Sequence, residues 1–188
     1  KKLKGTEPVE SLDLSRKDLG DNSAIVIASL IGVNTSLKSL DVGHNDIDKE
    51  QALALVSIFK EKDQMKSVGL ARCDLGVDGA KAVADYVSVS PSLTVANVLC
   101  NSLDADSAKM LSEVAKVRGI SLCGIKPGQT KADLKGSPGR HMGPTDAILL
   151  TADIFVRASL TAVWSPGHEL CHPTTHPLSL RALSCAHS

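Results

Sequence analysis

The chain has 188 residues, of which 43% are apolar and 22% are charged, a composition that suits one globular domain or one domain and a tail. Its 21 basic and 21 acidic residues balance, which argues against a nucleic-acid-binding protein. Five cysteines at irregular spacing are not typical of a disulfide framework, so we expect a reduced, cytoplasmic setting. No apolar run reaches the ~18 residues needed to cross a membrane, and we expect no membrane partner.

The first predicted elements are four short strands that begin 28 residues apart, after an N-terminal end at residues 1–8. Each strand segment has apolar residues at its first, third and eighth positions. The segments are LDLSRKDL (12–19), LDVGHNDI (40–47), VGLARCDL (68–75) and ANVLCNSL (96–103). Their sixth positions hold Lys17, Asn45, Cys73 and Asn101. A fixed period of this length indicates stacked repeats that share one continuous core.

A helix is predicted after each strand, because three apolar columns recur within every repeat at positions i, i+3 and i+7. The columns are Ala24, Ala52, Ala80 and Ala108; Ile27, Leu55, Val83 and Leu111; and Ile31, Phe59, Val87 and Ala115. The column of alanines predicts a place where helix and strand approach too closely for a larger side chain.

The period becomes irregular after the fourth repeat. Ile120–Leu122 would begin a fifth strand, only 24 residues after Ala96. Residues 126–141 are rich in glycine and proline, and we predict an irregular loop there.

A degenerate repeat is predicted over residues 142–163, because this segment overlays residues 19–40 without a gap. Gly143 then corresponds to Gly20 and Ala147 to Ala24. The overlay predicts a helix over about 144–156. By the same overlay Val163 would begin a further strand, but the pattern does not continue as one and stops from Trp164 onward.

Residues 9–125 resemble leucine-rich repeats of the long-repeat, ribonuclease-inhibitor-like class. The match is to L-x-L-x-x-(N/C)-x-L followed by a helix and a short return. The resemblance implies an α/β fold, a right-handed solenoid shaped as a horseshoe segment, with parallel strands on the concave face and helices on the convex face. It also implies that the Asn or Cys of each turn hydrogen-bonds the backbone. Lys17 departs from this pattern and leaves the turn of the first repeat open.

The resemblance further implies a non-enzymatic scaffold that binds another protein, as a fragment of a larger receptor or adaptor. Side chains between the buried strand residues point outward from the concave face. The partner-binding candidates among them are Asp13, Arg16, Asp41, His44, Arg72 and Asn97. The alternative is that these are ordinary solvated side chains.

A second functional hypothesis is a regulator of a small GTPase that uses the same scaffold. We expect a monomer without cofactor, catalytic residues or bound nucleic acid.

Residues 164–188 lack the repeat pattern and hold four of the six histidines, so we predict a disordered or non-repeat tail. Residues 168–172 of this tail, HELCH, match the H-E-x-x-H signature of zinc proteases. Pro173 follows directly after His172 and disfavours a helix through both histidines. Only 16 residues follow the motif, too few to build a substrate cleft. We therefore expect no metal site, and a zinc-dependent hydrolase is the remote alternative.

Overall fold

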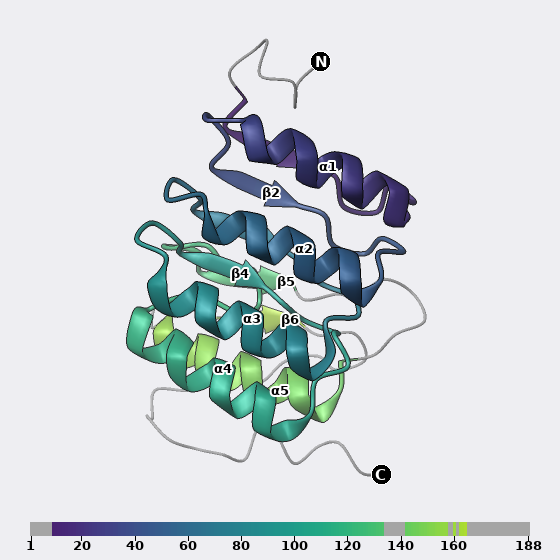
Figure 1. Ribbon diagram of the computed structural model, residues 1–188. Helices are drawn as coiled ribbons and strands as arrows, with labels where there is room; N and C mark the ends of the chain where they lie inside the picture. The colour runs from purple at the N-terminus through teal and green to yellow at the C-terminus, as the bar shows by residue number, and fades with distance from the viewer. Residues whose placement is uncertain (1–8, 134–141, 158–159, 161, 165–188) are drawn as a thin grey trace.

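A computed structural model describes residues 9–133, 142–157, 160 and 162–164 of the chain. Strands and helices alternate from Ser11 to Arg118. The strands lie in one layer and the helices in another, stacked in chain order (Figure 1). The strands are β1 (Ser11–Asp13), β2 (Ser39–Asp41), β3 (Ser67–Gly69) and β4 (Val95–Asn97). The helices are α1 (Asp21–Val33), α2 (Lys49–Lys60), α3 (Gly76–Val89) and α4 (Ala105–Arg118).

The four strands form one parallel sheet in the order β1-β2-β3-β4. Each residue pairs with the residue 28 positions along the chain, as Ser11 does with Ser39 and Gly69 with Asn97. Since the register equals the sequence period, side chains of one sequence column form one row across the sheet. The predicted α/β solenoid, with strands on the concave face and helices on the convex face, is confirmed.

The core lies between the two layers and consists of the predicted columns. Every residue of the three helix columns is at most 5% exposed, and the alanines of the first column are at most 1% exposed. Aspartate caps begin two of the four helices: the carboxylate of Asp48 accepts from the backbone N–H of Gln51 at 3.0 Å, and that of Asp104 accepts from Ser107 at 2.7 Å. These local signals and the apolar columns agree, so each repeat forms the same unit.

The chain after the fourth repeat contains β5 (Lys131–Asp133), α5 (Pro144–Val156) and β6 (Ala162–Trp164). Strand β5 pairs in parallel with β6 in a separate two-stranded sheet. The predicted fifth strand is reduced to one bridge, between Ser121 and Val95.

Two boundaries of the sequence prediction therefore change. Strand β5 lies inside the segment 126–141, for which a loop was predicted, because three residues with one apolar side chain are too few to show a period. Trp164 ends strand β6 and does not begin the tail.

Helix α5 has the predicted extent but buries a different face from the one that the overlay predicts. Asp146, Leu149 and Asp153 are at most 5% exposed, whereas Ile154 is 52% exposed and Ala147 is only half-buried. The helix follows β5 and not a strand of the main sheet, and it packs beside α4 (Figure 1). Its position relative to the sheet therefore differs from that of α1, and so does its buried stripe.

Candidate binding surface

The candidate residues of the concave face occupy two neighbouring columns. Asp13, Asp41 and Asn97 are the last residues of β1, β2 and β4, and the parallel register places Asp13 directly beside Asp41. Arg16, His44 and Arg72 each lie three residues beyond the end of β1, β2 and β3. We call these last three the Arg-His-Arg row.

Backbone geometry holds the Arg-His-Arg row in place. Arg16, His44 and Arg72 have φ values of 55°, 58° and 57°, in the left-handed region that side-chain-bearing residues seldom adopt. The N–H of Arg16 donates to the carbonyl of Gly43 at 3.2 Å, and that of His44 donates to Ala71 at 2.6 Å. Each turn is thus tied to the next repeat, and the three side chains leave the surface at equivalent points.

Asp41 is oriented by two glycines. Its Oδ1 accepts from the backbone N–H of Gly43 at 2.8 Å. A Cβ at Gly69, the partner of Asp41 in β3, would overlap the Asp41 carboxylate. Because glycine has no side chain, the Asp41 carboxylate can occupy the space above Gly69 on the concave face.

Asp13 is more exposed and is held by its own turn. Its Oδ1 accepts from the backbone N–H of Ser15 at 2.9 Å and from the Ser15 hydroxyl at 2.7 Å. These two hydrogen bonds lower the pKa of Asp13, with smaller contributions from the nearby Lys17 and Arg16. Asp13 and Asp41 thus form an acidic pair beside the Arg-His-Arg row.

His44 lies between the two arginines of its row. Burial lowers the pKa of its imidazole, the charges of Arg16 and Arg72 lower it further, and Asp41 opposes the shift. The imidazole is half-buried, so it is sensitive to any new charge placed on the row.

Access to the concave face decreases along the array. In the outward column, Ser11 is exposed whereas its counterpart in β4, Val95, is 4% exposed. Asn97 is half-buried, and a Cβ at Gly124 would lie 3.1 Å from its Nδ2. The structure therefore brings five of the six candidates together over the first three repeats and sets Asn97 apart.

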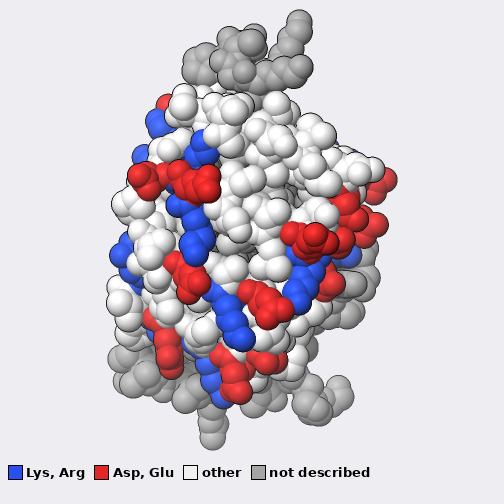
Figure 2. All heavy atoms as spheres, in the orientation of Figure 1, with Lys and Arg blue, Asp and Glu red and all other residues white. Residues whose placement is uncertain are grey.

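The helix face has a different charge pattern. Basic and acidic side chains alternate over the middle and lower helices, whereas the upper part of this face is almost uncharged (Figure 2). Several of the charges are paired between neighbouring helices, as Lys49 is with Asp78 and Lys60 with Asp85 at 3.9 Å. By contrast, neither Arg16 nor Arg72 forms an ion pair within the described part of the chain.

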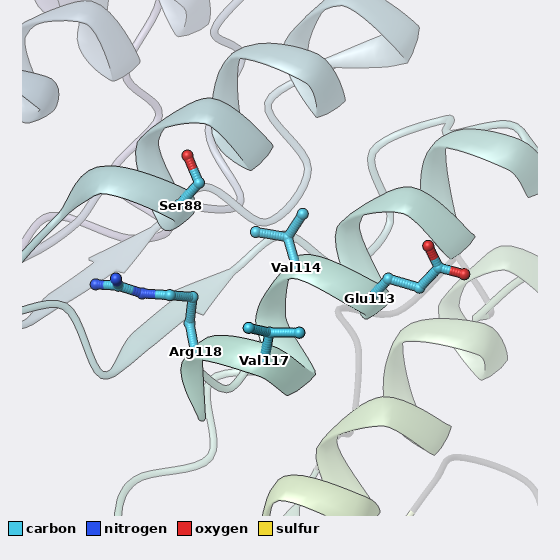
Figure 3. A pocket seen from close by; sticks show the side chains of 5 residues that line it. All are labelled: Ser88, Glu113, Val114, Val117 and Arg118. Atoms are coloured by element: carbon cyan, nitrogen blue, oxygen red, sulfur yellow. The ribbon is translucent and has the colours of Figure 1, made fainter.

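A hollow on the helix face was not predicted from the sequence. It has a volume of about 380 Å³ and lies between α3 and α4 (Figure 3). Its lining consists of Ser88 from α3 and of Glu113, Val114, Val117 and Arg118 from α4. Val117 is 87% exposed and Val89, the equivalent residue of α3, is 64% exposed. Val89 does not line the hollow, and Glu61 stands in the same column of the period, so no repeated sequence signal indicated it.

No metal centre can be built from the described residues. Among them, no three His, Cys, Asp or Glu side chains are grouped so that they could hold an ion. The HELCH motif at 168–172 lies outside the described residues. Within the same described part, no helix has the length and apolar character needed to cross a membrane.

Comparison with known proteins identifies the repeat. A leucine-rich-repeat family model matches residues 33–56. No curated protein shows significant similarity to the sequence. Among solved structures, Leiomodin-1 Actin-Binding Site 2 matches with a TM-score of 0.58 and 11% sequence identity, covering 82% of this chain and 84% of that chain. Residues 33–56 of the array therefore match a leucine-rich repeat, and the chain has the fold of a leucine-rich-repeat solenoid.

Proposed function

We propose that the chain is a protein-binding module whose partner contacts the concave face of the first three repeats. The observation that carries the proposal is the Arg-His-Arg row, whose two guanidinium groups are without ion pairs in the described part of the chain. The residues in the columns around the row have small side chains or none, as Ser39, Gly43 and Ala71 do. Long charged side chains on a small-residue surface are accessible to a partner, and arginine is enriched at such contacts.

The proposal includes the finer points of the sequence prediction. The repeats are of the ribonuclease-inhibitor-like class, as the 28-residue period and helices of 12 to 14 residues in α2 to α4 suggest. The module is a non-enzymatic monomer that acts in the cytoplasm, in line with the thiols of Cys73 and Cys123, which form no disulfide.

A phage-displayed random peptide library tests the proposed surface. Clones are selected on the wild-type chain and then assayed on the double variant Asp41→Lys and Arg72→Glu, which reverses both signs on the concave face. The matched control is Lys49→Glu with Asp78→Lys, which reverses an ion pair between α2 and α3 on the helix face.

We expect selected clones to bind the wild-type chain and the helix-face control, and to lose about tenfold or more in affinity on the concave variant, which is the scale of a small cluster of contacts. Clones that bind all three proteins equally, or an absence of selectable clones, would contradict the proposal. Circular dichroism establishes that both variants fold.

A further inference from the structure

The Arg-His-Arg row presents three nitrogen-bearing side chains in consecutive repeats. Neighbouring strands in a sheet lie ~4.8 Å apart, so the row spans roughly 10 Å at the level of the backbone. Arg16 is exposed, and His44 and Arg72 are half-buried. All three residues have the same left-handed backbone conformation, so their side chains leave the backbone in equivalent directions.

We propose that the Arg-His-Arg row binds a short acidic segment of a protein partner, which lies across the strands with its carboxylates on the turn side. This inference rests on the proposed function, because it specifies the chemistry of the partner at the same surface. Guanidinium groups recognise carboxylates through paired, charge-assisted hydrogen bonds. In an extended segment, alternate side chains point to the same side, so every second acidic residue can face the row.

The acidic pair beside the row limits the kind of anion that fits. Asp13 and Asp41 lie at the strand ends, three residues before Arg16 and His44. A long polyanion such as a nucleic acid would be repelled by these carboxylates as it crossed the face, and the chain carries no net charge to attract one. A short segment needs only two or three carboxylates on the turn side and avoids the acidic pair.

His44 makes the binding depend on pH. The charged groups that face it are Arg16 from the first repeat, Arg72 from the third and Asp41 from its own strand. In the free protein, burial and the two arginines lower the pKa of His44. A bound carboxylate opposes that effect and raises the pKa, so binding takes up a proton and the affinity increases as the pH falls.

The probe for this inference is the peptide acetyl-(Glu-Ser)4-amide, with acetyl-(Gln-Ser)4-amide as its neutral counterpart. Binding is followed by NMR, which locates weak contacts on the backbone amides and titrates the His44 imidazole. We expect the glutamate peptide to shift amide signals around the row and to bind about threefold more tightly near pH 6 than near pH 8, since surface charge pairs are individually weak. The neutral peptide produces no such shifts.

Three variants assign the effect. His44→Asn retains a residue that tolerates the left-handed turn, and it should abolish the pH dependence but retain peptide binding. Arg72→Ala should weaken binding about threefold, and the matched loss of charge on the helix face, Lys109→Ala, should leave it unchanged. Equal binding of the neutral peptide, shifts on the helix face, or an equal effect of Lys109→Ala would overturn the inference.

The library selection separates this inference from the proposed function. Clones that depend on the concave face but lack acidic residues would overturn the acidic partner and leave the binding surface intact. An absence of concave-face clones would instead overturn the proposed function.

Discussion

Turn asparagines connect each repeat to the one before it. The Oδ1 of Asn101 accepts from the backbone N–H of Cys73 at 2.8 Å and of Leu75 at 3.3 Å, while its Nδ2 donates to Leu70 at 2.7 Å. Asn45 makes the equivalent bonds to the first repeat, including 2.9 Å to the N–H of Lys17. Each asparagine thus bonds the preceding turn as well as its own, where Asn45 donates to Val42 at 2.7 Å, so the turn that contains Lys17 receives its bonds from Asn45.

Cys73 interrupts this series and gives a prediction at the residue scale. Its Sγ lies 3.8 Å from the carbonyl of Val42 and 3.7 Å from that of Ala71, but a thiol is a weak hydrogen-bonding group. Cys73→Asn would accept from the N–H groups of Asn45 and Ile47 as the other asparagines do. We expect the free energy of unfolding to rise by about 1 kcal/mol, measured by urea denaturation.

Asn101→Ala is the opposite change at an equivalent position. Asn101 is 1% exposed, so its loss leaves backbone donors and acceptors buried without partners, and we expect a decrease of about 2–4 kcal/mol. A Cys73→Asn protein less stable than wild type would show that the second turn does not accommodate the amide.

At the scale of the element, α5 supplies hydrogen-bond acceptors to the backbone where the regular repeats end. Oδ1 of Asp146 accepts from the N–H of Cys100 at 2.7 Å, in the last regular turn. Asp153 accepts from the N–H of Leu122 at 2.6 Å and of Cys123 at 3.0 Å, and also from the hydroxyl of Ser121. Two helical carboxylates therefore satisfy backbone donors at the end of the array.

Asp153 gives a pH prediction at this scale. Burial raises the pKa of its carboxyl, although four hydrogen bonds lower it in part. The folded state therefore holds the proton of Asp153 more tightly than the unfolded state does. As the pH rises from below 3.8 through the raised pKa, the contribution of Asp153 to the free energy of unfolding decreases. We expect the free energy of unfolding of Asp153→Asn, relative to that of wild type, to be higher at about pH 6.5 than at about pH 3.5. Urea denaturation at each pH measures this difference.

Asp153→Ala is the control for hydrogen bonding. It removes the acceptor as well as the charge, and we expect it to be less stable than Asp153→Asn at both pH values, by about 1–3 kcal/mol. A difference between wild type and Asp153→Asn that does not change with pH would contradict a raised pKa.

The element scale also shows the limit of periodicity. The overlay on residues 19–40 identified α5 because apolar residues of the right spacing are present, but the buried face of α5 does not follow from it. The overlay places Asp153 opposite Leu30, a position at which the earlier helices have large apolar or aromatic residues. A carboxylate can be buried at this position because α5 packs where Asp153 accepts hydrogen bonds from Ser121, Leu122 and Cys123.

At the scale of the whole molecule, the repeats differ in how many neighbours they have. Leu12 and Leu14 of the first strand segment are partly buried, whereas their counterparts Leu40 and Val42 are at most 1% exposed. In a repeat protein, stability is the sum of each repeat's own contribution and of its interfaces with adjacent repeats. Among the described residues, the first repeat has an interface on one side only.

This asymmetry predicts a gradient of local stability. We expect amides of α1 to exchange with solvent at least about tenfold faster than those of α3, which is enclosed by α2 and α4. Hydrogen exchange with mass spectrometry measures the rates on peptides from each helix. Equal protection of α1 and α3 would show that the array unfolds only as a single unit.

The repeat unit could be predicted without a structure, because a strand, a turn and a helix are local structures whose apolar columns recur at one period. The core columns follow from that period, and the resemblance to leucine-rich repeats implied the parallel sheet and the concave location of Arg16, His44 and Arg72. Three features became visible only in the folded chain: Arg16 and Arg72 form no ion pair with the described residues, Gly69 makes room for Asp41, and β5 and α5 end the regular array. These features depend on contacts between residues far apart in the chain, and such contacts have no periodic signature in the sequence.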